Sequence, residues 1–384
     1  MGTCPTHALR DMRLVVAIPE LGADNFGHHD DLVAAVRTIE REYQTQGLVL
    51  THATRPGSAL ELPWFTEDRH ADRRGLLFFE EMRRYLEAQP SRPAVCTFVY
   101  NCDRSRLNQL VFLATRFPNF MFVANLLFPG DWARKSWRGD NPRNVLLTSE
   151  LDTTLALLRR DYPGIKSEKL PLYVPQLSRV EPTVGLKDSK PKSQLLLLGS
   201  RDPKRGYQLA LNALGRRKDI LRLVDSITAK IGAKDDGAWV VRMTNKKLGQ
   251  FGESEIEFVE GHVDALRLSK ILESSSIVIL PYSPRDFRYQ ASGMFMHALQ
   301  FNVIPIVLNG TWMAQELRWL GLTELIAQDS AKSLASVIGY VLNNQATVRT
   351  KVDAVSHLIK LRYDRQSFLK FLSSLDGLFE KQTN

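Results

Sequence analysis

The segment from residue 277 to residue 308 constrains the fold most, because it reads as a strand, a polar loop, a helix and a second strand in immediate succession. Residues 277–280 have the length and apolar composition of a buried strand, which Pro281 ends. A helix with an apolar stripe then begins at Ser292 and Gly293 and ends at Asn302, before the next apolar run. This order predicts a β-α-β unit of a parallel sheet.

The start of that helix has the features of an anion site. Gly293 lacks a Cβ, so backbone N–H groups can approach a ligand closely, and the positive end of the helix dipole favours a phosphate there. Arg285, Arg288 and Tyr289 on the preceding loop can supply further donors. Ordinary packing of a β-α-β unit produces the same pattern, so both interpretations stand at this point.

Strand and helix patterns alternate through the whole chain, which predicts mostly parallel sheets. In the first half we expect strands at 14–18, 49–50, 95–99, 120–124 and 145–147, and helices at 31–43, 75–88, 107–116 and 152–160. In the second half we expect strands at 195–199, 239–243, 256–259 and 277–280, helices at 206–214 and 265–274, and closing helices at 331–344 and 353–376.

A proline-rich segment separates the two halves. Residues 171–191 carry four prolines and little periodicity, which is typical of a domain linker. We therefore expect domains at 1–170 and 192–345, with 346–384 as C-terminal helices. The predicted fold class is α/β, with two Rossmann-like domains that face a cleft, where ligands of such proteins bind.

Composition indicates a soluble globular protein, with 44% hydrophobic and 24% charged residues in a chain of 384. We find no apolar run near the ~20 residues that span a bilayer and no signal-peptide pattern, so we expect a cytoplasmic protein. Cys4, Cys96 and Cys102 fit neither a disulfide framework nor a metal signature. A reduced compartment fits these cysteines best, and no metal site is predicted.

Positive charge is concentrated in the second half. Residues 1–180 hold 23 Lys and Arg against 21 Asp and Glu, whereas residues 181–384 hold 28 against 21. This excess suits a polyanionic partner, such as a nucleotide diphosphate, an acidic membrane surface or nucleic acid. Nucleic acid is disfavoured, because the basic residues are dispersed and no nucleic-acid-binding motif accompanies them.

The loop that follows the first strand of the second half is also cationic. Between Gly199 and Gly206 the sequence places Arg201, Lys204 and Arg205 after a strand's carboxyl end and before a helix. Open α/β sheets bind ligands at this position, and a diphosphate suits such a loop. The alternative is a solvated turn. Two anion-binding features in one domain favour the ligand site.

Three segments of the second half carry a resemblance to a known family. They are LLLLGSRDPKRGYQLALNAL, FVEGHVDALRLSKILESSSIVILPY and SGMFMHALQFNVIPIV. Over roughly residues 170–345 the chain resembles the donor-binding domain of GT-B glycosyltransferases, particularly the retaining group called family 4, and less closely the bacterial polysaccharide glycosyltransferases. In the N-terminal half the likeness extends only to the general layout.

The resemblance implies a nucleotide-sugar donor as co-substrate, with no further cofactor. Its diphosphate would meet the first loop and the start of the second helix, with Arg288 and Tyr289 nearby. The residues implied are Gly199, Arg201, Lys204, Ser292, Gly293 and Met294.

One departure from the family pattern concerns the donor ribose. Where the family places a Glu that holds the ribose, this chain has His297, which can hydrogen-bond a hydroxyl but offers no carboxylate. A second family Glu falls at Tyr289, and Asp286 is the carboxylate on that loop.

The N-terminal domain would bind the acceptor, a glycan or a lipid-linked molecule. His28 or His29 beside Asp30 could act as a general base in an inverting reaction. Alternatively, Asp30 or Asp31 caps the following helix. A retaining reaction needs no protein base.

A short basic and aromatic segment, residues 132–138, suits contact with an anionic membrane, which would place the protein peripherally at its inner face. Alternatively, this segment stacks Trp on Arg within a loop, or it forms part of the acceptor site. The predicted function is transfer of a sugar in cell-surface polysaccharide or glycoconjugate synthesis. Two alternative functions remain. The protein could be a non-catalytic sugar-binding or scaffold subunit of a polysaccharide assembly complex, or a nucleotide-sugar epimerase.

Overall fold

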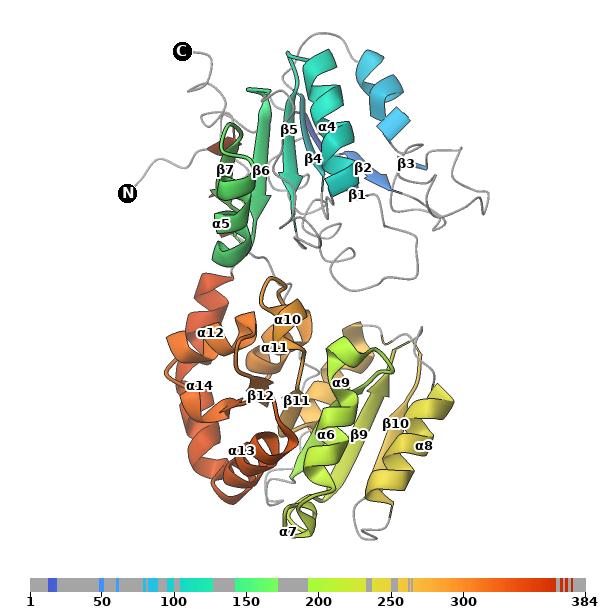
Figure 1. Ribbon diagram of the computed structural model, residues 1–384, viewed down its shortest axis with the longest axis vertical. Coiled ribbons are helices and arrows are strands. Elements are labelled where there is room, and N and C mark those ends of the chain that lie inside the picture. The colour runs from blue at the N-terminus through green and yellow to red at the C-terminus, as the bar shows by residue number, and fades with distance from the viewer. Residues whose placement is uncertain are drawn as a thin grey trace. The chain divides into compact units, whose positions relative to one another are not determined.

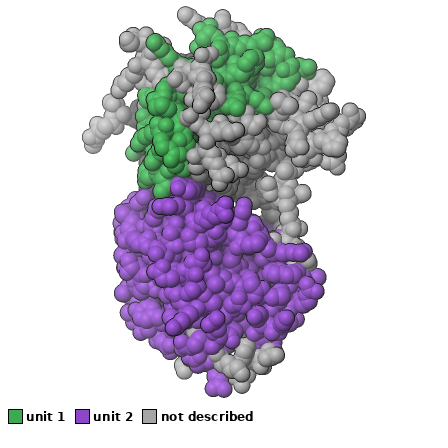
Figure 2. Space-filling model, in the orientation of Figure 1, with its two compact units in different colours: residues 1–175, 363–384 green, residues 176–362 purple. Residues whose placement is uncertain are grey.

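The computed structural model divides the chain into two compact units. Unit 1 comprises Met1–Pro175 with Tyr363–Asn384, and unit 2 comprises Gln176–Arg362 (Figure 2). The structure describes residues 13–18, 48–51, 60–61, 79–80, 82–88, 95–99, 104–126, 142–171, 193–232, 237–249, 255–261, 263, 265–363, 367–368, 370–371 and 374–375.

Unit 1 is built on a parallel sheet (Figure 1). Within the described residues its strand order is β3-β2-β1-β4-β5-β6-β7, and every pair of neighbours is parallel. The strands are β1 (Arg13–Ile18), β2 (Leu48–Thr51), β3 (Leu60–Glu61), β4 (Val95–Val99), β5 (Met121–Asn125), β6 (Val145–Ser149) and β7 (Lys166–Lys169).

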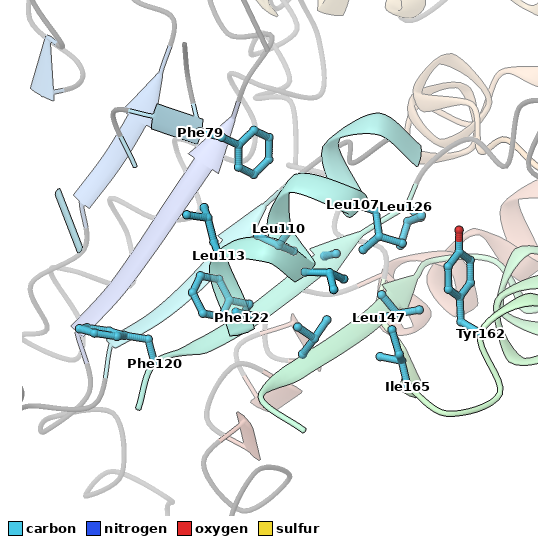
Figure 3. Packing of buried hydrophobic residues seen from close by; sticks show 14 of the residues in the cluster. Phe79, Leu107, Leu110, Leu113, Phe120, Phe122, Leu126, Leu147, Tyr162 and Ile165 are labelled. Atoms are coloured by element: carbon cyan, nitrogen blue, oxygen red, sulfur yellow. The ribbon is translucent and has the colours of Figure 1, made fainter. Parts of the chain in front are cut away.

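The core of unit 1 forms where α4 (Arg104–Arg116) packs on β5 and β6 (Figure 3). Leu107, Leu110 and Leu113 recur at helical spacing and are at most 2% exposed. They belong to the same buried cluster as Phe122 and Leu147. Removing side chains of this size from water stabilises the fold by roughly 1.5–3 kcal/mol each. The helix α5 (Asp152–Asp161) extends the cluster through Leu158.

Unit 2 contains a second parallel sheet, with strand order β10-β9-β8-β11-β12-β13 among the described residues. The strands are β8 (Gln194–Gly199), β9 (Ser226–Ile231), β10 (Glu255–Val259), β11 (Ile277–Leu280), β12 (Ile304–Leu308) and β13 (Ile326–Ala327). The chain first builds outward from β8 to β10 and then continues on the opposite side with β11. The topological switch point therefore lies between β8 and β11.

Helices cover both faces of this sheet. On one face, α6 (Tyr207–Leu214) packs against α8 (Gly237–Leu248) and α13 (Ala331–Asn343). On the other face, α11 (Gly293–Gln300) packs against α14 (Gln345–Arg362). Right-handed crossovers that run in opposite directions along the sheet place their helices on opposite faces. The described helices of unit 2 are η2 (Pro203–Arg205), α6 (Tyr207–Leu214), α7 (Lys218–Leu221), α8 (Gly237–Leu248), α9 (Ala265–Ser274), α10 (Pro284–Phe287), α11 (Gly293–Gln300), α12 (Trp312–Trp319), η3 (Thr323–Leu325), α13 (Ala331–Asn343) and α14 (Gln345–Arg362).

These observations confirm the predicted fold class: two Rossmann-like α/β domains. One predicted element is wrong, because residues 239–243 lie in the helix α8 and do not form a strand. The apolar run there is too short to decide between strand and helix, and Val240, Thr244 and Leu248 are buried at a spacing of four, which is helical. The strand that was missed is β9, whose sequence SITAKI carries few large apolar residues.

The boundaries of the two units can be compared with the domain boundaries expected from the sequence. The division between Pro175 and Gln176 falls inside the segment 171–191. Residues 346–384, which were expected to close the chain together, are divided: α14 ends unit 2 at Arg362, and Tyr363–Asn384 belongs to unit 1. None of the helices described for this chain is both long and apolar enough to cross a membrane.

Candidate functional site

The loops that follow β8 and β11 begin side by side at the switch point of unit 2. The two strands are hydrogen-bonded neighbours, with Ile279 opposite Leu197. Each loop leads to a helix that returns toward the next parallel strand, so α6 and α11 both start at the carboxyl edge of the sheet. The structure therefore places both predicted anion-binding features at one edge.

A close backbone contact joins the two loops. Gly206 ends η2 with φ of 66°, and a Cβ at this position would lie 1.8 Å from the carbonyl oxygen of Pro281. Beside it, the Ser283 N–H donates to the Lys204 carbonyl oxygen at 2.9 Å. Only glycine combines the positive φ with this approach. The loop after β8 is thus held against the loop after β11.

An arginine and two aromatic rings strengthen this junction. The Arg205 guanidinium lies 5.3 Å from the Tyr282 ring centre and 5.9 Å from that of Phe287, and its Nη1 donates to the Tyr282 hydroxyl at 3.2 Å. Tyr282 and Phe287 are 0% and 4% exposed. Cation–π contacts of this kind contribute about 0.5–2 kcal/mol. Arg205 therefore helps to hold the two loops together.

Lys204 and Asp286 connect the loops through their charges. The Lys204 Nζ lies 3.8 Å from the Asp286 Oδ1, with the two side chains 61% and 29% exposed. An exposed pair at this distance contributes at most about 1 kcal/mol. An arriving phosphate can therefore displace it. Asp202 has a different role, because its Oδ1 accepts from the Lys204 backbone N–H at 3.0 Å and caps η2.

The start of α11 retains the features of an anion site. Ser292 is the N-cap and is 5% exposed, and its Oγ accepts from the Phe295 N–H at 3.3 Å. The N–H groups of Gly293 and Met294 belong to the first turn, where no helix carbonyl can accept from them. Both residues are partly exposed.

His297 lies further along α11 and is 8% exposed. Its Nδ1 lies 3.1 Å from the Gln300 Oε1. Burial lowers the pKa of His297, and the hydrogen bond with Gln300 offsets part of this effect. The imidazole is therefore neutral at pH 7 and offers a ligand hydroxyl a neutral partner.

The remaining predicted residues are less closely tied to this junction. Arg201 is exposed one residue beyond the buried Ser200, and the Arg288 guanidinium lies 5.9 Å from the Tyr289 ring centre. His28, His29 and Asp30 lie outside the described residues, as does the segment 132–138.

Sequence reasoning missed the aromatic pair Tyr282 and Phe287. Two aromatic residues that flank a Ser-Pro-Arg-Asp segment after a buried strand are a signal that could have indicated a cation–π contact. Among the described residues, we find no group of three or more His, Cys, Asp or Glu side chains that could hold a metal ion.

Another polar group was missed in unit 1, at the ends of β5 and β6. Asn125 is fully buried, and its Nδ2 has no hydrogen-bond partner within the part of the chain that the structure describes. The Thr148 hydroxyl lies 3.4 Å from the Asn125 Oδ1, and the Ser149 hydroxyl donates to the Leu126 carbonyl at 3.0 Å. Polar residues at the end of apolar strands were the available signal.

Solved structures with the same architecture cover nearly the whole chain. Sucrose-phosphate synthase from Thermosynechococcus elongatus matches with a TM-score of 0.70 and 15% identity over 97% of this chain and 100% of that one. WaaG, a glycosyltransferase involved in lipopolysaccharide biosynthesis, matches with 0.61 and 12% over 95% and 99%. Anabaena HepE in complex with UDP and glucose matches with 0.62 and 11% over 96% and 100%.

No protein-family model and no curated protein sequence matches this chain. The structural likeness, at 11–15% identity for the three proteins above, establishes a fold of GT-B type. The function must therefore be argued from the site.

Proposed function

We propose that this protein is a glycosyltransferase and that unit 2 binds the diphosphate of a nucleotide-sugar donor. The observation that carries the proposal is the junction at the switch point, where the Lys204 loop is held against the loop that leads to α11. Such loops at the carboxyl ends of neighbouring strands are where open α/β sheets bind phosphates. The diphosphate would meet Arg201, Lys204 and the first amides of α11.

The same groups provide the means of catalysis. When the bond between sugar and diphosphate breaks, negative charge grows on the leaving diphosphate, and fixed donors stabilise it. Arg201 and Lys204 supply cations, while the N–H groups of Gly293 and Met294 lie at the positive end of a helix. This scheme suits the retaining reaction of family 4, because it requires positioning and charge stabilisation without a protein base.

Unit 1 would bind the acceptor, a glycan or a lipid-linked molecule. WaaG, with the same fold, is involved in lipopolysaccharide biosynthesis. This supports a place for the present protein in polysaccharide or glycoconjugate synthesis.

Thermal unfolding with a panel of nucleotide diphosphates tests the donor proposal. A ligand at about 100 times its Kd stabilises the folded state by about 2.7 kcal/mol, which raises the Tm of a domain of this size by roughly 5–10 °C. We expect such a shift with one nucleotide diphosphate and none with the nucleoside alone. Unchanged unfolding with every nucleotide in the panel would contradict the proposal.

His297 favours a second candidate, a non-catalytic sugar-binding subunit, because a neutral imidazole stands where related transferases have a carboxylate. Under this reading, His297→Ala leaves the protein's function intact. A transferase instead loses turnover or donor affinity with the same substitution. Incubation with donor and no acceptor also detects a nucleotide-sugar epimerase, which would form an epimeric nucleotide sugar.

A further inference from the structure

We propose that Glu316, Trp319 and Arg362 form a clamp that holds α14 to unit 2 through its last residue, so that any rotation between the two units takes place beyond Arg362. Arg362 ends both α14 and unit 2, and the chain continues in unit 1 from Tyr363. This inference concerns the passage of the chain between the units. It goes beyond the proposed function and does not depend on it.

The clamp contacts the Arg362 guanidinium on two sides. Its Nη2 lies 3.4 Å from the Glu316 Oε1, and its Cζ lies 4.3 Å from the centre of the Trp319 ring. Glu316 and Trp319 are three residues apart on α12, so they lie on the same face of that helix. The Glu316 side chain is 6% exposed and that of Arg362 is 32% exposed. A planar guanidinium suits this arrangement, because it can stack on a ring and pair with a carboxylate at the same time.

The rest of α14, which lies beside α12 in Figure 1, is also tied to unit 2. At its start, the Ser193 hydroxyl donates to the Gln345 Oε1 at 2.8 Å. Further along, the Lys351 Nζ lies 2.6 Å from the Glu324 Oε1. Ile359, near the end of the helix, is 1% exposed. The clamp completes this series of contacts at the last residue of the helix.

The position at which α14 ends supports a role for the clamp. The sequence pattern predicts one helix over residues 353–376, and this range contains neither glycine nor proline. Nevertheless, α14 ends at Arg362. Because no helix-breaking residue accounts for this end, tertiary contacts must determine it. The clamp supplies such contacts at the residue where the helix stops.

Stability alone does not explain the clamp. Burial of a carboxylate is costly, and an apolar pair of similar volume is often at least as stable as a buried ion pair. A cation near a helix C-terminus is favourable, but an exposed lysine would provide the same effect. The pair has another consequence. If the end of α14 moves away, Glu316 loses this partner in a buried position, which opposes the movement.

The clamp therefore limits where the chain can bend between the units. The chain passes between them twice, from Pro175 to Gln176 and from Arg362 to Tyr363. Hinges consist of a few loop or element-terminal residues that absorb the change in φ and ψ. The last turn of a helix is such a position, and the clamp excludes the last turn of α14 from the hinge.

Hydrogen exchange of the full chain, followed by mass spectrometry, tests whether the clamp holds the end of α14. Arg362→Met keeps a long unbranched side chain and removes the charge, so the amides of residues 359–362 should exchange about tenfold faster. Trp319→Leu removes the ring and keeps the ion pair, so it should give a smaller increase at the same residues. The matched control is Arg318→Met, which removes an exposed cation of α12 that bonds to Asn309 and should leave this exchange unchanged.

A second measurement tests whether the clamp also limits movement between the units. Spin labels on Asn108→Cys in α4 and Asn245→Cys in α8 report the distribution of distances between unit 1 and unit 2, in a chain whose own three cysteines are replaced by alanine. We expect a broader distribution in Arg362→Met and an unchanged one in Arg318→Met. Unchanged exchange at residues 359–362 in Arg362→Met and in Trp319→Leu overturns the clamp. Faster exchange with an unchanged distance distribution overturns its role between the units.

Discussion

The carboxyl edges of the two sheets differ in charge and in how completely their polar groups are paired. In unit 2, the described edge carries Lys204 and Arg205, and the loops that hold them are joined by a backbone hydrogen bond and cation–π contacts. In unit 1, the ends of β5 and β6 carry Asn125 and Thr148, and the Asn125 Nδ2 is buried with no hydrogen-bond partner among the described residues.

This difference indicates that the two similar folds suit different ligands. A cationic, preformed edge suits an anion, because little reorganisation is needed when the ligand arrives. The side chains Asn125, Thr148 and Ser149 at the ends of β5 and β6 are uncharged and at most 1% exposed, so they present no such cations. The sequence shows the same contrast, since its positive charge excess is +2 for residues 1–180 and +7 for residues 181–384.

The largest effect is expected when the two loops of unit 2 are forced apart. In Gly206→Ala, the new Cβ would lie 1.8 Å from the Pro281 carbonyl oxygen at a φ of 66°. We expect a loss of about 3–5 kcal/mol in the free energy of unfolding, measured by urea denaturation, together with loss of nucleotide binding.

Gly321→Ala is the matched control, because Gly321 has φ of 74° and a Cβ there would meet nothing within 4 Å. It should cost only the backbone strain of about 1–2 kcal/mol. Equal effects of the two substitutions would show that the contact with Pro281 is unimportant. The loops of unit 2 would then not be held together by this contact.

The second effect concerns the charge of unit 2. Lys204→Ala or Arg201→Ala should raise the Kd for a nucleotide diphosphate about 10–100-fold, because a charge-assisted hydrogen bond is lost. Lys246→Ala, an exposed position on α8, is the control and should bind normally. Normal binding by the Lys204 and Arg201 variants in calorimetric titration would show that these two cations do not bind the diphosphate.

The third effect concerns the buried amide of Asn125 in unit 1. Asn125→Leu removes a buried amide whose Nδ2 lacks a partner among the described residues, so stability should change by no more than about 1 kcal/mol, while nucleotide affinity stays unchanged. By contrast, the Asn144 amide donates to the carbonyls of Ala114, Phe117 and Phe120. Asn144→Leu should cost about 2–3 kcal/mol. Weaker nucleotide binding in Asn125→Leu would contradict the assignment of the two edges.

The smallest effect is expected from acid, and it concerns His297 in unit 2, where both described histidines lie. Burial lowers the pKa of His297 below the ordinary histidine value of 6.5. As pH falls below about 6.5, the unfolded chain takes up a proton that the folded protein resists, so stability decreases. Urea denaturation between pH 5 and 8 should show this decrease weakened in His297→Gln and retained in the control His357→Gln.

The fold could be predicted from sequence because parallel strands are buried on both faces. Apolar runs such as 195–198 and 277–280 are therefore strong signals. Asn302, expected to end a helix, follows α11 with φ of 58°. The pattern failed at α8 and β9, where short segments of mixed polarity fit either structure and tertiary packing decides.

Part of the candidate site was also predictable. A strand, a cationic loop and a helix in sequence indicated Arg201 and Lys204, and the glycine at a helix start indicated Gly293. The contact of Gly206 with Pro281 and the stacking of Arg205 on Tyr282 could not be read from sequence, because they join residues more than seventy positions apart. Such contacts depend on which strands become neighbours.

A crystal structure of the full chain soaked with uridine or guanosine diphosphate tests the central claim most directly. The account predicts density for the two phosphates at the switch point of unit 2, with oxygens within about 3 Å of the Lys204 Nζ and of the first amides of α11. Phosphates bound anywhere else on the chain, with Lys204 still paired to Asp286, would contradict it.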